Sequence, residues 1–398
     1  MRTIVAFSRH SDSLEAIREL VRATETPEKT KPQLLFYYAT IGYDETVLMN
    51  ELSAAFPDVP MHGGTSCQGI MTHRGALCTG DRCMGLLALF DPDGAYGVGM
   101  APLGAHPRTT GVIAGREALK QANREGEIPT MVWVTNAPGH EEEVLAGLED
   151  LFGPNVPICG GSSADDDLTG QWKQFANGRV HENAAVVAVL FSPGQIGFSF
   201  HSGYDPTTKM AVITRCEGRT IQELDGRKAA HVYNEWLDNR LADLLPTGGN
   251  LMQRTALHPL GRVAGLIGEI PYFQLSHPAT MTREGGLTLF TGISPNEKVW
   301  LMQGTQEGLV KRAERAARSA VDSLSPLQGR ISGAMVMFCA GCMFIVRERM
   351  NDVVAGLRRG LGDDVPFLGA FTYGEQGCFV GGENRHGNFM VSLLVFTE

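Results

Sequence analysis

The chain carries one nine-residue stretch three times, first as Asp58-Val59-Pro60-Met61-His62-Gly63-Gly64-Thr65-Ser66. The second copy reads Asn155-Val156-Pro157-Ile158-Cys159-Gly160-Gly161-Ser162-Ser163, and the third reads Asp364-Val365-Pro366-Phe367-Leu368-Gly369-Ala370-Phe371-Thr372. A Val-Pro pair followed by glycine indicates a short strand that ends in a sharp turn, because glycine tolerates backbone conformations that other residues avoid. Repetition of such a segment predicts a fold assembled from equivalent units.

The sequence around each copy follows one plan. A helical pattern precedes the first copy, with Leu48, Leu52 and Phe56 on one helix face. We predict a strand before the helix that leads to each copy, over 34–39, 130–135 and 334–340. After the turns we predict strands over 83–90, 184–191 and 389–396. The helices that open the units are predicted over 13–22, 111–122 and 307–324. This alternation predicts an α/β fold of internally repeated strand–helix–strand units that form two layered domains with mixed sheets.

The spacing of the copies sets the predicted domains. Val59 and Val156 are 97 residues apart, whereas Val156 and Val365 are 209 apart, so different sequence intervenes before the third copy. We interpret residues 199–286, with a helix over 229–244, as a connector and the start of a C-terminal domain. The prediction is an N-terminal domain over 1–216, with repeats 1–105 and 106–216, and a C-terminal domain over 217–398.

Polar side chains follow every repeated turn. Glycines after Val-Pro can serve the backbone alone, at a sharp strand exit. In α/β sheets, however, ligands bind beyond the carboxyl ends of strands, where such loops gather. If the loops converge, their hydroxyls and free N–H groups can hold a polar or anionic ligand. The candidate ligand-binding residues are Gly63, Gly64, Thr65, Ser66, Cys67, Gly160, Gly161, Ser162, Ser163, Asp165, Thr372, Tyr373 and Glu375, together with Cys339 and Cys342 at a later strand end.

Composition excludes several classes of protein. The 398 residues include 44 acidic and 34 basic side chains, for a net charge of −10, which argues against a dedicated nucleic-acid binder. No apolar run reaches the roughly 18 residues of a membrane span, and the N-terminus turns polar too early for a secretory signal. Eight cysteines without an export signal are expected to be thiols in a reducing compartment. The prediction is a cytoplasmic protein that binds neither nucleic acid nor membrane.

Several motifs together carry a family resemblance. The run Cys159 to Asp167, followed by Gln174-Phe175-Ala176-Asn177-Gly178 and the strand 184–191, resembles the N-terminal FIST domain, and Gly63 to Cys67 is similar to that domain's earlier glycine–serine signature. Features similar to the C-terminal FIST domain are Gly218-Arg219 with Leu224-Asp225-Gly226, the strand from Ala334 to Cys339, and Tyr373-Gly374-Glu375. The resemblance covers nearly the whole chain.

The resemblance implies a sensory module of bacterial signalling that binds a small molecule. Because no kinase, receiver or cyclase segment is recognisable in this chain, its output partner would be a separate protein, such as a sensor kinase or a cyclic-dinucleotide enzyme. A subset of the family is described as haem-binding sensors of nitric oxide. This chain departs from the family at Cys342, where many members have arginine.

Cysteine and histidine chemistry leaves alternatives open. Cys339-Ala340-Gly341-Cys342 can bind metal, cycle as a dithiol, or place two small side chains at a buried strand end. Cys67 is a candidate nucleophile without an identifiable base. The candidate haem ligands are His62, beside a repeated turn, and His181, in a predicted hairpin, with His201 and His277 as weaker options.

Three consecutive aspartates are the remaining candidate metal ligands. Asp165, Asp166 and Asp167 can hold Mg²⁺ or Ca²⁺, but they lack EF-hand spacing, and a capped acidic turn is the favoured interpretation. The leading hypothesis is a cytoplasmic sensor whose ligand lies between the turns and the Cys339–Cys342 strand end and shifts a conformational equilibrium. The alternative is a hydrolase or lyase that uses Cys67 or a repeat serine as nucleophile, with Asp165 or Glu375 as acid–base group.

Overall fold

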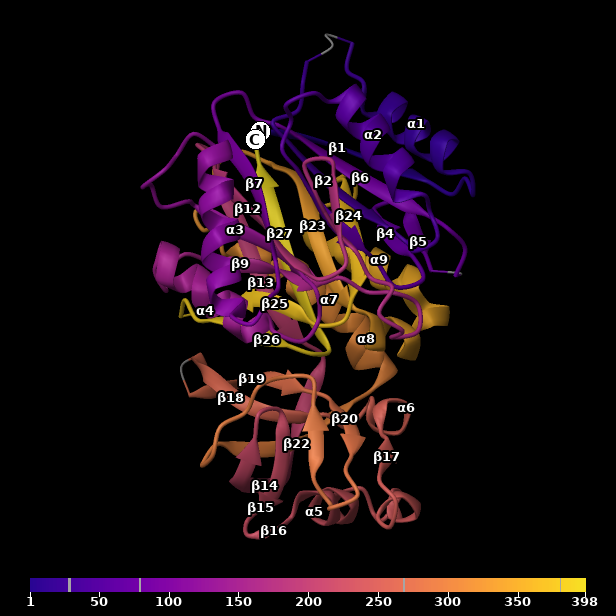
Figure 1. Cartoon of the computed structure of the whole chain (residues 1–398), viewed down its shortest axis with the longest axis vertical. Helices are drawn as coiled ribbons and strands as arrows, with labels where there is room; N and C mark the ends of the chain where they lie inside the picture. The colour runs from indigo at the N-terminus through magenta and orange to yellow at the C-terminus, as the bar shows by residue number, and fades with distance from the viewer. Residues whose placement is uncertain (28–29, 79, 268, 380) are drawn as a thin grey trace.

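The computed structural model describes residues 1–27, 30–78, 80–267, 269–379 and 381–398. Figure 1 shows a large body that holds both chain ends, with a smaller domain below it. The body contains three repeats: the first runs from β1 to β6, the second from β7 to β12, and the third comprises β13 and then α7 to β27. The smaller domain, residues 204–304, interrupts the third repeat and is called the inserted domain below.

The elements of the first two repeats match each other one for one. The first repeat contains β1 (Arg2–Ser8), α1 (Ser13–Thr24), β2 (Leu34–Ala39), α2 (Glu45–Ala55), β3 (Met61–Thr65), β4 (Ile70–Thr72), β5 (Gly75–Leu77) and β6 (Met84–Phe90). The second contains β7 (Ala95–Pro102), α3 (Pro107–Gln121), β8 (Met131–Asn136), α4 (Glu141–Phe152), β9 (Ile158–Ser162), β10 (Gln174–Ala176), β11 (Arg179–His181) and β12 (Ala184–Phe191).

The third repeat keeps this order around the inserted domain. It contains β13 (Ile196–Ser202), α7 (Gln306–Asp322), β23 (Ile331–Cys339), α8 (Ala340–Ile345), η2 (Arg347–Arg349), α9 (Met350–Leu361), β24 (Phe367–Thr372), β25 (Glu375–Cys378), β26 (Asn384–Gly387) and β27 (Met390–Thr397). The inserted domain contains β14 (Tyr204–Glu217), β15 (Thr220–Leu224), β16 (Arg227–Lys228), α5 (Ala229–Trp236), η1 (Ala242–Leu244), β17 (Gly249–Asn250), α6 (Met252–Thr255), β18 (Leu260–Ile267), β19 (Ile270–Ser276), β20 (Pro278–Met281), β21 (Leu287–Leu289) and β22 (Lys298–Gly304).

Each repeat builds most of one six-stranded sheet. The orders are β1-β6-β2-β3-β10-β11, β7-β12-β8-β9-β25-β26 and β13-β27-β23-β24-β4-β5. In each sheet the Val-Pro strand runs parallel to the strand before it, as in β2–β3, β8–β9 and β23–β24, whereas its other neighbours run antiparallel. The predicted α/β fold with mixed sheets is therefore confirmed.

The sheets exchange hairpins in one direction. The hairpin β4–β5 of the first repeat completes the third repeat's sheet through β24. The second repeat's hairpin β10–β11 completes the first sheet through β3, and the third repeat's β25–β26 completes the second through β9. Every repeat thus gives one hairpin to a neighbour and receives another.

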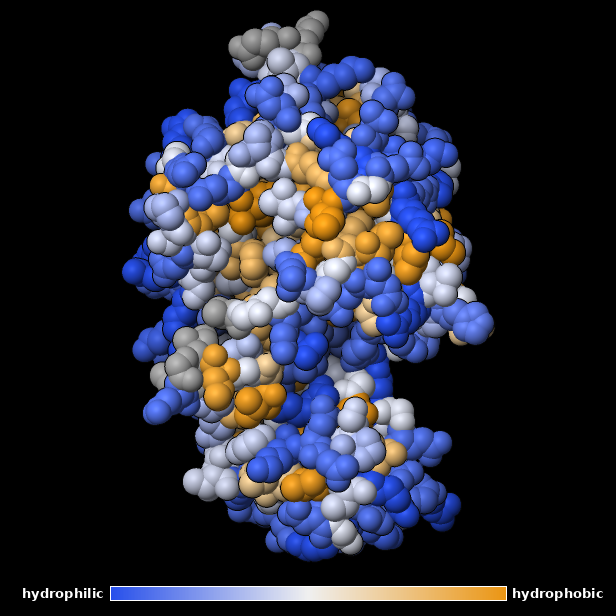
Figure 2. Space-filling model, turned by 90° about the vertical axis from the view of Figure 1, so that its left-hand side faces the viewer, coloured by the Kyte–Doolittle hydropathy of each residue, from blue (hydrophilic) through white to orange (hydrophobic). Residues whose placement is uncertain are grey.

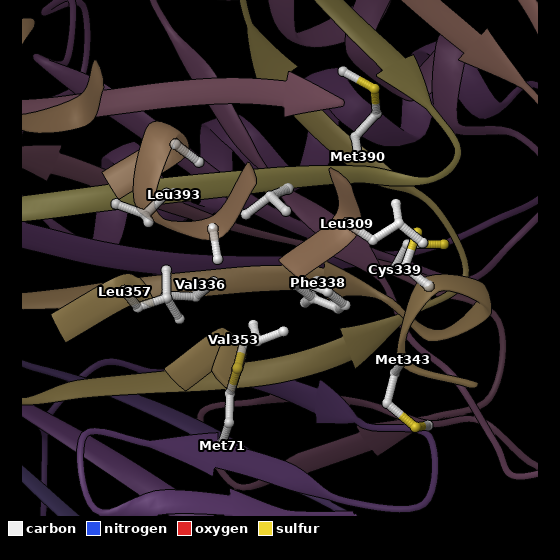
Figure 3. Packing of buried hydrophobic residues seen from close by; sticks show 14 of the residues in the cluster. Met71, Leu309, Val336, Phe338, Cys339, Met343, Val353, Leu357, Met390 and Leu393 are labelled. Carbon is white, nitrogen blue, oxygen red and sulfur yellow. The ribbon is translucent and has the colours of Figure 1, made fainter. Parts of the chain in front are cut away.

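The strands read as continuous apolar runs because both of their faces are covered. In β2, Phe36 and Tyr38 face a central core shared by the three sheets, together with Trp133, Met335 and Phe396. The alternate residues Leu35 and Tyr37 face the helices α1 and α2. Helices α3 and α4 cover the second sheet in the same way, and α7 and α9 cover the third, where Val336, Phe338 and Leu393 pack with Val353 and Leu357 (Figure 3).

The inserted domain differs from the sequence expectation. Residues 204–304 form a separate sheet with a core of their own, and the predicted boundary between 216 and 217 falls inside β14. The helix expected over 229–244 ends at Trp236, because Asp238 and Asn239 adopt left-handed backbone angles, with φ of 54° and 63°. Among the described residues, no helix has both the length and the apolar character needed to cross a membrane. All eight cysteines are free thiols.

Candidate functional site

The three repeated turns meet and bind one another. Ala164 N–H donates to Thr65 O at 3.0 Å, which joins the second turn to the first. Tyr373 N–H donates to Ser162 O at 3.2 Å, which joins the third turn to the second. Cys67 N–H donates to Phe371 O at 3.0 Å, which joins the first turn to the third. The convergence assumed from the sequence is present.

The paired glycines have a packing role at this meeting point. A Cβ at Gly63 would lie 1.8 Å from Tyr37 O, and one at Gly160 would lie 1.9 Å from Val134 O, so each first glycine lets two parallel strands approach closely. The second glycines make room for the next repeat. A Cβ at Gly64 would lie 2.6 Å from Ser163 Oγ, and one at Gly161 would lie 2.7 Å from Thr372 Cγ2.

These contacts use the groups that the sequence assigned to a ligand. The N–H groups of Cys67, Ala164 and Tyr373 donate to carbonyls of other turns, and Gln68 N–H donates to Asp166 Oδ1 at 2.7 Å. The expectation that free N–H groups at the turns would hold an anion is therefore corrected: these donors already have acceptors within the protein.

A cleft of about 620 Å³ lies beside the turns. Its wall is formed by all three repeats and by the inserted domain. Figure 2 shows, from another side, that the molecule narrows between the large body and the inserted domain. The lining residues are Gln68 from the first repeat; Asp166, Asp167 and Leu168 from the second; Cys339, Ala340, Gly341, Phe344, Ile345, Thr372, Tyr373, Asn388 and Phe389 from the third; and Met252, Gln253, Ala256, His277 and Phe290 from the inserted domain.

The wall is mostly apolar, with polar groups at defined points. The His277 ring lies 4.3 Å from the Phe389 ring and 5.9 Å from the Phe290 ring, measured between centroids. The backbone N–H of His277 donates to Asn388 Oδ1 at 3.0 Å, so a hydrogen bond joins the inserted domain to the third repeat across the wall. Clefts of this size with a few placed polar groups are typical small-molecule sites.

Three of the predicted ligand-binding residues line this cleft: Cys339, Thr372 and Tyr373. The others lie behind its wall. Gly63, Gly64, Thr65, Ser66, Cys67, Gly160, Gly161, Ser162, Ser163, Asp165, Cys342 and Glu375 are buried and do not line it.

Asp165 acts as a loop cap. Its Oδ1 accepts from Leu168 N at 2.7 Å and from the Tyr373 hydroxyl at 2.8 Å, and its Oδ2 accepts from Gly170 N and Gln171 N at 2.7 and 2.8 Å. Burial raises the pKa of this carboxyl, but the donated hydrogen bonds outweigh burial, so the pKa lies below its usual value. No group of three or more ligating side chains that could hold a metal ion occurs among the described residues.

The candidate nucleophile is poorly placed. Cys67 is fully buried, and burial, reinforced by the nearby Asp166 carboxylate, raises the pKa of its thiol well above the usual value. The turn serines are equally buried, and Ser162 donates its hydroxyl proton to Glu141 Oε1 at 2.8 Å. Burial also raises the pKa of Glu375 well above its usual value, with Cys339 adding to the shift. These properties favour structural roles.

The two leading haem-ligand candidates, His62 and His181, do not line the cleft. His62 is buried in the central core, where its Nε2 lies 2.9 Å from Thr135 Oγ1, and burial lowers its pKa to about 3. His181 lies on the β11 hairpin, and its Nδ1 accepts from Asn183 N at 3.0 Å. His277 does line the cleft, but its Nε2 lies 3.3 Å from Thr255 Oγ1. The His277 ring also has a hydrogen bond to the Met252 backbone. Among the described residues that line the cleft, therefore, no histidine offers an uncommitted ring to a haem, and the site does not fit that group.

Much of the cleft wall carried no sequence signal. Gln68 and Asp166 to Leu168 directly follow the repeated turns, so they could have been found by extending the motif by a few residues. The contributions of Met252, Ala256 and Phe290 belong to no motif, because they reach the cleft through the position of the inserted domain.

A buried ion pair links the inserted domain to the second repeat. Arg219 Nη2 lies 2.8 Å from Glu141 Oε2 and also binds Glu142, at the first turn of α4. Gly292 N–H donates to Glu142 as well. Burial raises the pKa of Glu141, but the charges of His386 and Arg219 outweigh this effect and hold the pKa at about 2.

Two protein-family models match this chain. The FIST N domain model matches residues 33–227, and the FIST C domain model matches residues 229–378. The protein therefore belongs to the FIST family, as its motifs predicted. Domains of this family are generally small-ligand sensory domains of signalling proteins.

Other comparisons are more distant. An uncharacterized protein of Methanocaldococcus jannaschii is 33% identical over 99 residues, which are 24% of this chain and 19% of that protein, so the match spans about a fifth of that relative. The crystal structure of a cyanuric acid hydrolase from A. caulinodans aligns over 99% of both chains at 10% identity with a TM-score of 0.35. A second cyanuric acid hydrolase structure gives 8% identity and a TM-score of 0.32. Scores at this level support no argument about function.

Proposed function

We propose that this protein is a cytoplasmic sensor that binds a small, uncharged and largely apolar molecule in the cleft and passes the bound state to a separate signalling protein. The observation that carries the proposal is the cleft of about 620 Å³, whose wall comes from every repeat and from the inserted domain. A molecule bound there contacts both modules at once, which is what a sensor of domain arrangement requires.

The chemistry of the wall supports this ligand class. Met252, Phe290 and Phe389 offer apolar and aromatic surface, whereas Gln253 offers an amide for orientation. The carboxylates of Asp166 and Asp167 stand on one side of the cleft and disfavour an anion. The haem version of the sensor gains no support here, because the histidine ring nitrogens of the described residues are engaged or lie elsewhere.

The connections between the modules supply a mechanism. The chain enters the inserted domain at Tyr204 and leaves it at Gly304, and these two residues are paired in the β14–β22 ladder. A two-strand connection of this kind lets the inserted domain tilt on the body as a unit. A ligand that contacts both sides of the cleft favours one tilt, and a partner that reads that tilt receives the signal. A sensor kinase or a cyclic-dinucleotide enzyme is the partner class that the family resemblance implies.

The proposal is tested by a substitution that fills the cleft with a large side chain. Ala256→Trp places a large ring in the wall, and Ala54→Trp makes the same change on the exposed face of α2. Native mass spectrometry of the purified protein detects a retained small molecule, and thermal unfolding with a panel of neutral aromatic compounds detects binding. A ligand at one hundred times its Kd stabilises the folded state by about 2.7 kcal/mol.

We expect the wild type and Ala54→Trp to retain or respond to the same compounds, and Ala256→Trp to lose that response while unfolding cooperatively. Equal responses from all three proteins would place binding outside the cleft. A wild type that is purified empty and is not stabilised by any compound of the panel would count against the proposal.

A further inference from the structure

Two thiols meet where the cleft wall passes into the core. Cys339 is the last residue of β23 and caps α8, and Cys342 is the third residue of that helix. Side chains at these two positions face each other across the first helical turn. Cys339 lines the cleft with 6% of its surface exposed, whereas Cys342 is fully buried behind it. Figure 3 shows Cys339 and Met343 at this end of β23, away from the aliphatic residues further along the strand.

A buried cation adjoins the pair. Arg312 of α7 has no exposed surface; it donates through Nη1 to Phe389 O, and its guanidinium lies 4.6 Å from the centre of the Phe338 ring. Its Nε and Nη2 have no hydrogen-bond partner among the described residues. A buried guanidinium with unpaired donors needs a nearby anion.

Cys342 is the group that can supply this anion. Burial raises the pKa of its thiol, but the hydrogen bond from Cys339 and the charge of Arg312 outweigh burial, so the pKa lies below its usual value. The Tyr204 hydroxyl adds a contact at 3.9 Å from Cys342 Sγ. Glu375 is the other acid near Arg312, but its oxygens accept from Thr372 Oγ1 at 2.8 Å and Met390 N at 3.0 Å, and burial favours its neutral form.

We propose that Cys339 and Cys342 are a redox-active dithiol, which a low-molecular-weight disulfide entering the cleft oxidises to a Cys339–Cys342 disulfide. A metal site is the competing interpretation of the motif, but the described residues bring no third ligating side chain to this pair. Two adjacent cysteines, one facing the cleft and one behind it, form the arrangement that thiol–disulfide exchange needs.

The exchange balances in two steps. The Cys339 sulfur attacks one sulfur of the incoming disulfide while its proton passes to the Cys342 thiolate; a mixed disulfide forms on Cys339, and one small thiolate leaves. That thiolate takes the proton from Cys342, whose sulfur then attacks the Cys339 sulfur and releases the second small thiolate. The two cysteines are oxidised, and one small disulfide is reduced to one thiol and one thiolate, which takes its proton from solvent.

Oxidation has a local electrostatic consequence. The disulfide carries no charge, so Arg312 loses its thiolate, and Glu375, whose pKa the charge of Arg312 lowers, is an acid able to replace it. Glu375 accepts a hydrogen bond from the hydroxyl of Thr372, which lines the cleft. The redox state of the pair is thereby linked to the cleft wall.

The experiment uses the full chain carrying Cys216→Ser, because Cys216 is partly exposed and is a background thiol outside the pair. The protein is incubated with bis(2-hydroxyethyl) disulfide, alkylated and analysed by intact mass and peptide mapping. Before alkylation we expect a mass loss of about 2 Da, from two hydrogens, with no adduct retained; after alkylation the peptide map should contain a peptide linked through Cys339 and Cys342. Adding Cys342→Ser should trap the mixed disulfide on Cys339, and adding Cys339→Ser should abolish the reaction.

The control is Cys159→Ser, which removes a buried thiol of another repeat and should leave the reaction unchanged. The proposal is overturned if Cys339 and Cys342 remain free to alkylation after unfolding, or if the new disulfide joins other cysteines. The peptide map of the background protein decides this even where a substitution at Cys339 or Cys342 prevents folding.

Discussion

The guanidinium of Arg219 lies 2.8 Å from Oε2 of Glu141 and thereby fastens the inserted domain to the second repeat. The pair has a buried side, because the Glu141 side chain is 2% exposed and the Arg219 side chain 22%. Gly218, directly before Arg219, has φ of 56°, which the turn between β14 and β15 requires. The Gly-Arg motif seen in the sequence therefore combines a turn with an inter-module ion pair.

Removing the Glu141 charge should destabilise the protein. We expect Glu141→Gln to lower the free energy of unfolding by about 3 kcal/mol, because Arg219 is left without its buried partner. The folded-state pKa of about 2 lies below the unfolded value of 4.5, so this contribution is present above pH 4.5 and is lost as the pH falls toward 2. Urea unfolding across this pH range measures it. Arg108→Met, which breaks the exposed pair with Asp150, should change little.

The packing of the Thr372 side chain against Gly161 is also testable. Gly161→Ala places a Cβ 2.7 Å from Thr372 Cγ2 and should destabilise the fold, whereas Gly104→Ala should not, because no atom lies within 4 Å of the added Cβ. Thr372→Ser removes the closest methyl group and should restore part of the loss when combined with Gly161→Ala. Thermal unfolding of Gly161→Ala, Gly104→Ala, Thr372→Ser and the double variant measures these differences in stability. A double variant no more stable than Gly161→Ala would contradict the steric explanation.

The cap formed by Asp165 should be visible in local dynamics. Asp165→Asn replaces a carboxylate that accepts from three backbone N–H groups, so amide exchange at Leu168, Gly170 and Gln171 should speed up. Lowering the pH through the depressed pKa of Asp165, below the usual 3.8, should loosen the same loop in the wild type. Asp167→Asn is the matched control, and equal exchange in the two variants would rule out the cap.

Acid sensitivity should trace partly to His62. Because burial lowers its pKa to about 3, the folded state binds fewer protons than the unfolded state between pH 3 and the ordinary value of 6.5. Stability should therefore rise with pH across that window, and His62→Phe should reduce the slope by about 1.4 kcal/mol per pH unit. His181→Phe, on the partly exposed β11, serves as the comparison; an unchanged slope in His62→Phe would refute this assignment.

Local pattern predicted the elements of the body well. The strands expected at 34–39 and 184–191 coincide with β2 and β12, because both are continuous apolar runs flanked by polar turns. Repetition also suggested that the three turns could converge, although the sequence alone left this open. These features depend on interactions between residues close in the sequence, or on symmetry that the sequence displays directly.

The candidate site was harder to predict because it depends on distant partners. Cys339, Thr372 and Tyr373 were identified, and His277 was named only as a weaker haem-ligand option. Phe389 was not assigned to the site, since it meets His277 through contact between the third repeat and the inserted domain. The turn N–H groups looked available in sequence, but carbonyls of other repeats accept their hydrogen bonds. Pairings between segments hundreds of residues apart leave no local pattern.

The hairpin exchange makes the body a closed cycle, comparable to a three-membered ring of subunits joined into one polypeptide. Without the third repeat, the hairpin β4–β5 would have no sheet to join, because its partner β24 would be missing. Strand β9 would have an open edge, because its partner β25 would be missing. Exposed edges of that kind promote aggregation. A fragment of residues 1–216 is accordingly expected to lack the closed ring. Among the described residues, the inserted domain is the part that lies outside this ring.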